Sequence, residues 1–302
     1  MEFLRMLEGI RTPLGEALFL ILTYGGEEIM LLGLICVLYW CVDKRTGYRM
    51  IFCYLPSALA INILKLTCRV ERPWVRDPSF TIVEKAKASA TGYSFPSGHT
   101  QNATTLFGTL AYVSKKTWQK LLFLLIIPLV MLSRMYLGVH TPSDVLTSFA
   151  ITTVIVIGMN LLADKLTLTH KRRLIIMCVI LVIAMATCIY TYVLYSSGVI
   201  VYKDASDSFK DCGAGMAIAV CWVIETRYIN FDTKCRNIWM QLLKLLIGVA
   251  GALLIKEGIK YSFNALLGPS FFTDVFRYFL LMTWAMIGMP LIIKKFFQNE
   301  NR

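Results

Sequence analysis

The sequence predicts an all-α membrane protein, a bundle of about nine transmembrane helices with an interfacial helix at its N-terminus. Of the 302 residues, 57% are hydrophobic and only 17% are charged, so the chain is more apolar than a typical water-soluble domain. The apolar residues form runs long enough to cross a hydrocarbon core, which takes about 17–25 residues of helix. Most charged residues fall between these runs, as expected for loops at a membrane surface.

Residues 1–26 are expected to form a separate interfacial or re-entrant segment. Charges at helical spacing flank an apolar stripe in the first ten residues. The apolar run that follows, residues 14–24, is too short to cross a membrane alone. This combination is typical of a helix that lies in the plane of the membrane surface.

Membrane-length helices are expected in the rest of the chain, joined mostly by short loops. They are predicted at residues 27–42, 47–66, 98–114, 119–138, 143–163, 173–197, 212–226, 239–263 and 274–293. The helices of residues 27–163 are predicted to form a core bundle, and those of residues 164–302 an accessory C-terminal group. Trp40, Trp222 and Trp284 lie near predicted span ends, which fits an aromatic belt at the membrane interface.

The distribution of basic residues predicts the orientation. The loops on the side of the C-terminus hold the larger share of Lys and Arg, which indicates the cytoplasmic side. The long polar loop of residues 67–97 then faces outward, and loops of that length are uncommon unless they are functional. The net charge of +12 does not indicate nucleic-acid binding, because no basic helix or zinc spacing accompanies it. Anionic lipid headgroups are the expected partners of these bases.

Three short segments hold the polar residues that can carry chemistry. They are KLTCRVERP from Lys65 to Pro73, PSGH at residues 96–99, and SRMYLGVHTPSD from Ser133 to Asp144. By the predicted topology all three reach the same membrane face. The protein has only three histidines, and two of them lie in these segments.

These segments match the pattern K-x6-RP, PSGH and SR-x5-H-x3-D at every motif position. The chain therefore resembles the type 2 phosphatidic acid phosphatase superfamily of integral membrane lipid phosphatases. The stretch YLGVHT is similar to the branch that contains sphingosine-phosphate and dolichyl-diphosphate phosphatases. The motifs cover residues 65–144, and residues 164–302 lie outside the resemblance. The resemblance implies a phosphohistidine on His140, with His99 as the acid that protonates the leaving group and later activates water.

The cationic residues of the motifs suit a phosphoryl group. Lys65, Arg72 and Arg134 supply three positive charges for its oxygens. Ser97, Gly98 and His99 begin a helix, where free backbone N–H groups face an anion and Gly98 allows close approach. No Asp, Glu, His or Cys cluster has metal spacing, and the nine cysteines form no CxxC pair. We therefore expect neither a metal ion nor another cofactor.

Asp144 follows His140 by four residues, close enough to bind one imidazole nitrogen and leave the other free to attack phosphorus. Asp144 could instead be only the acidic member of a capping box that begins at Thr141. Ser97 could likewise act as a helix N-cap as well as a phosphate ligand. We favour the catalytic interpretation of Asp144 because His140 precedes it at this spacing.

The predicted activity is metal-independent hydrolysis of a lipid phosphate or lipid diphosphate at the outer face of the plasma membrane. Two alternatives remain open. A lipid phosphotransferase would use the same phosphohistidine with an acceptor other than water, and a lipid transporter would carry the motifs as a vestigial site.

Overall fold

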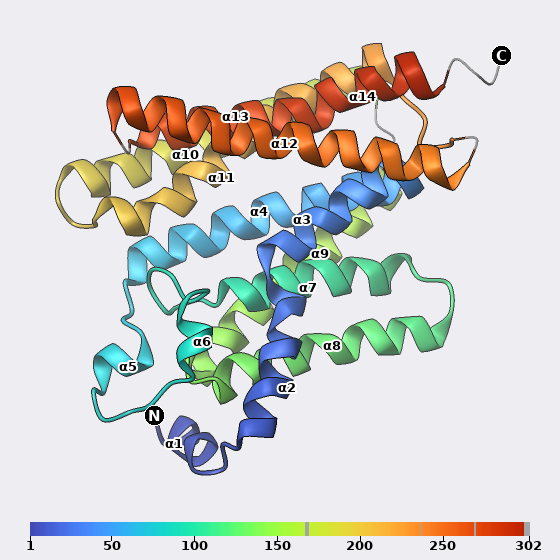
Figure 1. Ribbon diagram of the computed structural model, residues 1–302. Coiled ribbons are helices and arrows are strands. Elements are labelled where there is room, and N and C mark those ends of the chain that lie inside the picture. The colour runs from blue at the N-terminus through green and yellow to red at the C-terminus, as the bar shows by residue number, and fades with distance from the viewer. Residues whose placement is uncertain (167–168, 236, 269, 299–302) are drawn as a thin grey trace. The chain divides into compact units, whose positions relative to one another are not determined.

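The computed structural model describes residues 1–166, 169–235, 237–268 and 270–298. Every regular element in these ranges is a helix (Figure 1), so the predicted all-α class is confirmed for the described residues. The chain divides into two compact units. Unit 1 comprises residues 1–34 and 49–165, and unit 2 comprises residues 35–48 and 166–302.

Unit 1 is built around helix α7, which packs against α8 and α9. Most side chains of α7 are buried, including its Thr, Gln and Asn residues. Helices α3 and α4 pass from one unit into the other. The helices that lie wholly or partly in unit 1 are α1 (Glu2–Gly9), α2 (Pro13–Thr23), α3 (Glu28–Val37), α4 (Lys44–Cys68), α5 (Pro73–Arg76), α6 (Glu84–Lys87), α7 (Gly98–Val113), α8 (Thr117–Tyr136) and α9 (Pro142–Lys165).

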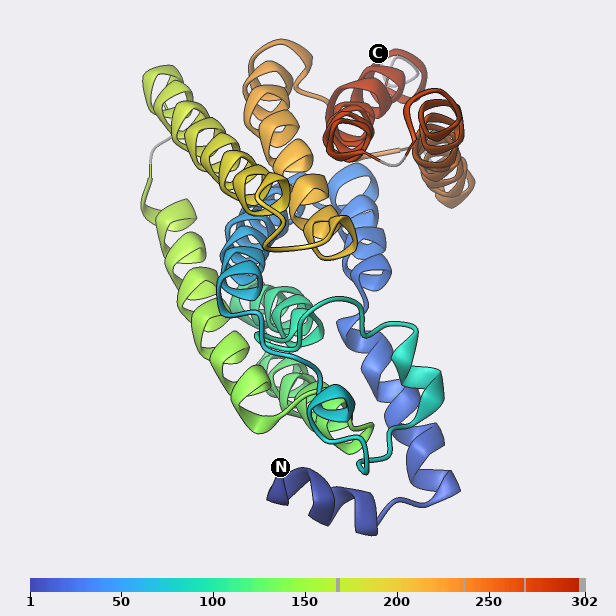
Figure 2. The same ribbon diagram turned by 90° about the vertical axis from the view of Figure 1, so that its left-hand side faces the viewer.

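The N-terminal segment crosses the other helices of unit 1. Helix α2 runs steeply across α8 (Figures 1 and 2) and contacts it. Thr12 caps α2 through its side-chain oxygen, and Pro13 takes the first helical position, where its missing N–H costs nothing. A 3₁₀ turn at Tyr24–Gly26 then bends the path by 48° before α3 begins. This bend brings the chain against the start of α7.

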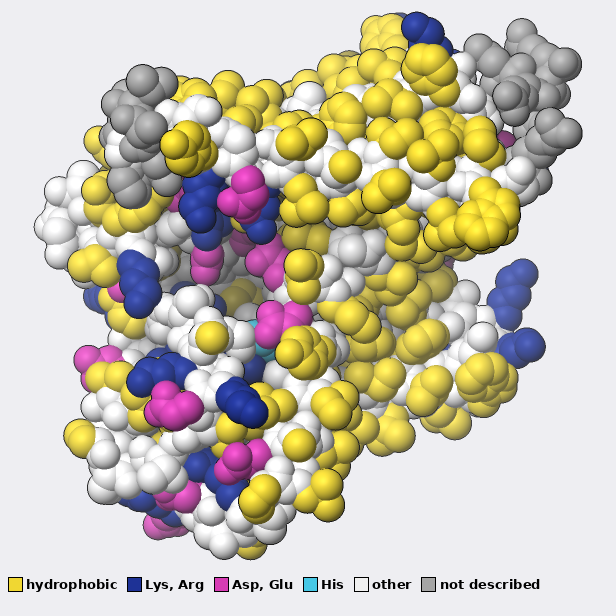
Figure 3. Space-filling view, viewed as in Figure 1, with side chains coloured by type: hydrophobic (Ala, Val, Ile, Leu, Met, Phe, Trp, Pro, Cys, Tyr) yellow, Lys and Arg dark blue, Asp and Glu magenta, His cyan; other side chains and the backbone are white. Residues whose placement is uncertain are grey.

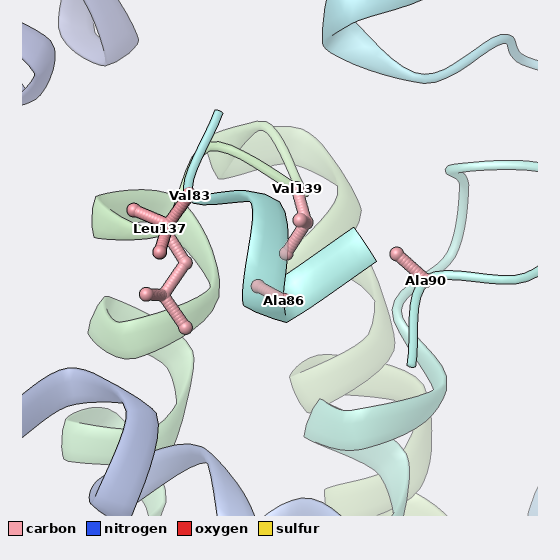
Figure 4. Close-up of a cluster of buried hydrophobic side chains, with 5 residues drawn as sticks. All are labelled: Val83, Ala86, Ala90, Leu137 and Val139. Carbon is pink, nitrogen blue, oxygen red and sulfur yellow. The ribbon is translucent and has the colours of Figure 1, made fainter. Parts of the chain in front are cut away.

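The long loop of residues 67–97 is folded onto the turn between α8 and α9. Val83, Ala86 and Ala90 form a small buried cluster with Leu137 and Val139 (Figure 4). The backbone N–H of Val83 also donates to the carbonyl of Leu137 at 3.1 Å. The loop therefore fixes the turn that directly precedes His140.

Unit 2 contains the C-terminal helices together with the short segment of residues 35–48. Trp40 is fully buried and donates from Nε1 to the carbonyl of Ala285, while Trp284 donates to the carbonyl of Gly248. The interpretation of Trp40 and Trp222 as an interfacial belt is wrong, because both rings are buried within the protein. The helices that lie wholly in unit 2 are α10 (His170–Ser196), α11 (Tyr202–Ile224), α12 (Ile238–Leu267), α13 (Phe271–Thr283) and α14 (Met289–Ile292).

The described residues contain seven helices long and apolar enough to cross a membrane, or eight if the bent pair 13–42 is one span. The chain is an integral membrane protein, but the predicted count of about nine spans is not confirmed. The segment predicted at 98–114 forms only the 16-residue helix α7, whose polar side chains are buried by protein. The span predicted at 212–226 begins earlier, at Tyr202. In Figure 3 large apolar areas cover much of the visible surface.

Unit 2 is braced by a buried carboxylate, which generates a stability prediction. Glu225 is fully buried and accepts hydrogen bonds from Lys44 Nζ at 2.9 Å, from the Tyr48 hydroxyl and from the backbone N–H of Phe231. Removing Glu225 leaves the buried Phe231 N–H and the Lys44 ammonium, which is 21% exposed, without their carboxylate, and an unpaired buried donor costs about 1–3 kcal/mol. Glu225→Ala should therefore lower the melting temperature of the detergent-purified protein clearly.

The matched control is Asp207→Ala, which breaks the exposed pair with Lys210. Exposed pairs contribute about 0–1 kcal/mol, so this variant should melt close to wild type. Equal melting temperatures for the two variants would contradict the bracing role of Glu225.

Candidate active site

The three sequence motifs meet at one end of unit 1. Helices α4 and α8 end there, and α7 and α9 begin there, on the left of Figure 1 and toward the viewer in Figure 2. Lys65 and Arg134 lie in the last turns of α4 and α8. His99 and Asp144 lie in the first turns of α7 and α9. Helix ends, rather than helix middles, therefore supply the candidate site.

His140 lies between an arginine and a carboxylate and is 2% exposed. Its Nε2 is 3.0 Å from Nη1 of Arg72, and its Nδ1 is 3.4 Å from Oδ2 of Asp144. A guanidinium only donates, so Nε2 must be the accepting nitrogen and the proton of the neutral ring is on Nδ1. The neutral ring thus has its lone pair on Nε2 and its proton on Nδ1, which lies near Asp144 without forming a hydrogen bond of good geometry.

Asp144 is held by two short hydrogen bonds besides its contact with His140. Its Oδ2 accepts from the Ser94 hydroxyl at 2.6 Å and from the backbone N–H of Thr141 at 2.7 Å. The Thr141 hydroxyl in turn accepts from the N–H of Asp144, which completes a capping box. The carboxylate therefore both caps α9 and faces His140, so the two interpretations of Asp144 are compatible.

Arg72 is largely committed to protein partners. Nε donates to the carbonyl of Gly92, Nη2 to that of Thr91, and Nη1 to that of Val139 as well as to His140. These contacts tie the long loop to the α8–α9 turn. A phosphate that bound two N–H groups of Arg72 would therefore have to replace at least one of these contacts.

Arg134 is fully buried and only partly satisfied. Nη1 donates to the hydroxyls of Thr23 at 2.8 Å and Ser89 at 3.3 Å. Nε and Nη2 are buried and have no hydrogen-bond partner. Leaving buried donors unpaired costs about 1–3 kcal/mol each, more in a charged group. Such a guanidinium is suited to bind an anion.

The start of α7 faces the same region. The Ser97 hydroxyl caps the helix by accepting from the N–H of Thr100, as predicted for an N-cap. The Lys65 ammonium reaches this helix start, because a Cβ placed on Gly98 would lie only 3.7 Å from its Nζ. The Lys65 cation thus lies beside the first turn of α7, where backbone N–H groups lack acceptors within the helix.

His99 has a partner that sequence reasoning missed. Its Nε2 lies 3.1 Å from Oε1 of Glu27, which is 72 positions away in the chain. Burial, followed by the cation of Arg134, lowers the pKa of His99 to about 4, while Glu27 opposes this shift. The only signal in the sequence was an acidic residue after Gly25-Gly26 within an apolar N-terminal stretch.

All eight predicted site residues lie in unit 1, and the contacts above connect them in two groups. Arg72, His140, Asp144 and Ser97 are joined through side chains and through the hydrogen bond from the Ser97 N–H to the Asp144 carbonyl at 3.1 Å. Lys65, Gly98, His99 and Arg134 gather at the start of α7. The Arg134 cation also acts on His140, which relates the two groups. The chemical roles of these residues stay predictions.

Comparison with known proteins places the motifs in a family. Residues 47–168 match the sequence model of the PAP2 superfamily. Residues 209–301 match a second model, described as PAP2 superfamily phosphatase, transmembrane extension. Searches of curated proteins and of solved structures found no match. The matches do not distinguish the branch to which the YLGVHT stretch is similar.

The buried histidine of the α8–α9 turn should make stability depend on pH. Burial and the Arg72 cation hold the pKa of His140 well below its ordinary value of about 6.5. As the pH falls below about 6.5, the unfolded chain therefore takes up a proton that the folded chain does not, and stability is lost at up to about 1.4 kcal/mol per pH unit. His140→Gln should melt with a shallower pH dependence than wild type between about pH 5 and 7.

His170→Gln is the matched control, since it removes an exposed imidazole in unit 2. The two proteins should differ: the control should follow wild type and the His140 variant should not. If the melting temperature of the His140 variant depended on pH as steeply as that of wild type, then His140 would not stay neutral in the folded protein.

Proposed function

Because the chain belongs to the PAP2 superfamily, we propose that it is an integral membrane phosphatase that hydrolyses a lipid phosphate or lipid diphosphate through a phosphohistidine on His140. The observation that carries the mechanism is the 3.0 Å contact between Arg72 and His140 Nε2, because a guanidinium can only donate and so leaves the lone pair on Nε2. The proton of the neutral ring is then on Nδ1, 3.4 Å from Asp144, so the ring is set up as a nucleophile.

Phosphate binding is assigned to the cations and to the start of α7. The two unpartnered nitrogens of Arg134, the Lys65 ammonium and the first backbone donors of α7 bind the equatorial oxygens. The incoming phosphate displaces Arg72 from Nε2 of His140, and the freed N–H then donates to a phosphate oxygen. Arg72 keeps its carbonyl contacts during this exchange, so the loop and the turn stay in place.

The chemistry has two displacements at phosphorus. The lone pair of His140 Nε2 forms an N–P bond while the bond to the leaving oxygen breaks, and that oxygen takes a proton from His99. Asp144 stabilises the positive charge that develops on the ring of His140. Water then attacks phosphorus, gives a proton to His99, and breaks the N–P bond. The products are free phosphate and the lipid alcohol or monophosphate.

An apolar groove supports a lipid substrate. It has a volume of about 590 Å³ and lies among α7, α8 and α9 of unit 1. Its wall includes Thr104, which follows His99 by five residues and so lies about 7.5 Å farther along α7. A hydrocarbon chain bound there would extend from the neighbourhood of the candidate site. The other lining residues include Gly108, Leu124, Ile127, Phe149 and Val156.

The outer face of the plasma membrane is the proposed location of the site. The bias of Lys and Arg toward the loops on the C-terminal side supports a cytoplasmic C-terminus. The ends of α4 and α8 and the starts of α7 and α9 then lie on the opposite face.

Loss of the nucleophile tests the mechanism. His140→Ala should lower phosphate release by about 10⁴–10⁶-fold, as removal of a covalent nucleophile commonly does. The measurement is phosphate release by detergent-purified protein from a panel of lipid mono- and diphosphates, with the variant as the blank. A variant that keeps a substantial fraction of wild-type turnover would rule out His140 as nucleophile. If the labelled phosphoryl group appeared on another molecule instead of as free phosphate, the protein would be a phosphotransferase.

Removal of divalent ions by a chelator tests whether the site works without a metal. Three cationic side chains supply the positive charge that a metal ion supplies elsewhere, and no group of three or more His, Cys, Asp or Glu in the described residues could hold a metal. Phosphate release should therefore survive dialysis against EDTA. A strict requirement for a divalent ion, restored by adding the metal back, would contradict metal independence.

A further inference from the structure

Glu27 enters the candidate site from outside the three motifs. It follows the 3₁₀ turn Tyr24–Gly26 at the bend between α2 and α3, and its side chain is 26% exposed. Its Oε1 lies 3.1 Å from Nε2 of His99. The other charged groups that act on this imidazole are Arg134 from α8 and Lys65 from α4, both cations. Glu27 is the acidic group that acts on His99 among the described residues.

The backbone around Glu27 is built for this contact. A Cβ on Gly26 would lie 2.6 Å from the carbonyl oxygen of His99 and 3.0 Å from Val130, so only glycine permits the approach. The Asn102 side chain donates to the carbonyl of Gly26 at 3.0 Å and fixes the segment to α7. Two contacts of the Gly26 backbone with α7, one to the His99 backbone and one to the Asn102 side chain, therefore hold Glu27 next to His99.

An ionised carboxylate only accepts, so the Nε2 of His99 that faces it carries a hydrogen. Nδ1 is then the nitrogen left to exchange a proton with the leaving oxygen and with water. The negative charge of Glu27 also favours the protonated ring, against burial and the two cations. An acid catalyst needs that proton at the moment the leaving oxygen departs.

We propose that Glu27 is the positioning residue of His99, which holds the proton on Nε2 and presents Nδ1 as the acid and base of the reaction. This inference rests on the proposed phosphatase function. Each of the two imidazoles then has its own carboxylate: Asp144 for His140, and Glu27 for His99. The second carboxylate comes from the bend between α2 and α3, so this bend helps to position the acid of the reaction.

The test is Glu27→Gln, which keeps the shape of the side chain and removes its charge. Its kcat for an alkyl lipid phosphate should fall roughly 10²-fold, within the range of general acid–base catalysis, with a much smaller change in KM. The limb of the pH profile on which activity falls with rising pH should move to lower pH, because His99 loses its proton more easily. Glu27→Asp should restore part of the rate.

The leaving group separates a proton-transfer role from a structural one. An aryl phosphate releases a weakly basic oxygen that needs little protonation. The rate of phosphoenzyme formation should therefore fall much less in Glu27→Gln with an aryl phosphate than with an alkyl phosphate. Equal losses with both substrates would show that the substitution merely disturbs the site, and would overturn the proposal.

Glu28→Gln is the matched control. The Glu28 carboxylate accepts a hydrogen bond from the Tyr54 hydroxyl at 3.2 Å. Glu28→Gln should leave kcat within about twofold of wild type, because substitutions of surface residues outside the active site usually have small effects. Wild-type kcat and pH profile in Glu27→Gln would refute the positioning role. A rise in kcat/KM would instead mean that Glu27 obstructs the site, which also refutes it. If wild type and His140→Ala were equally inactive, the proposed function itself would have failed.

Discussion

The contact between Arg72 and His140 is the interaction on which the rest of the candidate site depends. A guanidinium cannot accept a hydrogen bond, so its approach to Nε2 at 3.0 Å determines which imidazole nitrogen carries the lone pair. The remaining N–H groups of Arg72 hold the carbonyls of Thr91, Gly92 and Val139. One side chain thus joins the long loop, the α8–α9 turn and the nucleophile. Because it is buried, the contact persists without competition from water.

Each imidazole of the site has a carboxylate beside it and cations around it. His140 lies near Asp144 and His99 near Glu27, while Arg134 acts on both rings. Arg134 is the cation with buried N–H groups to spare. Burial strengthens all these interactions, because the surrounding protein screens charge less than water does. Burial also favours the neutral form of both imidazoles. The neutral form is the one that His140 needs as a nucleophile. For His99 the same effect opposes the protonated form that an acid catalyst needs.

Much of this site was accessible from the sequence, because its residues occur at fixed spacing around helix ends. The predicted cap at Ser97 and the proximity of His140 to Asp144 follow from local geometry. Glu27 could not be found this way, since its contact with His99 depends on how the bend after α2 docks on α7. The engagement of Arg72 with carbonyls likewise depends on the fold of the long loop.

The same distinction explains the span count. Apolar composition identifies a helix that can lie in lipid, but α7 shows that a helix can be surrounded by protein and remain shorter than a span. The bent pair in residues 13–42 depends on the glycines at its break. Trp40 was misassigned for a related reason, because a position near a span end does not reveal whether another helix covers the ring.

Direct identification of the phosphorylated residue tests the central claim. The protein would be mixed with a lipid phosphate labelled on phosphorus, quenched in alkali within one turnover, digested and analysed by mass spectrometry. The account predicts an acid-labile, alkali-stable phosphoryl group on the peptide that contains His140, absent from the His140→Ala protein. Turnover without any covalent label, or a label on another residue, would contradict it.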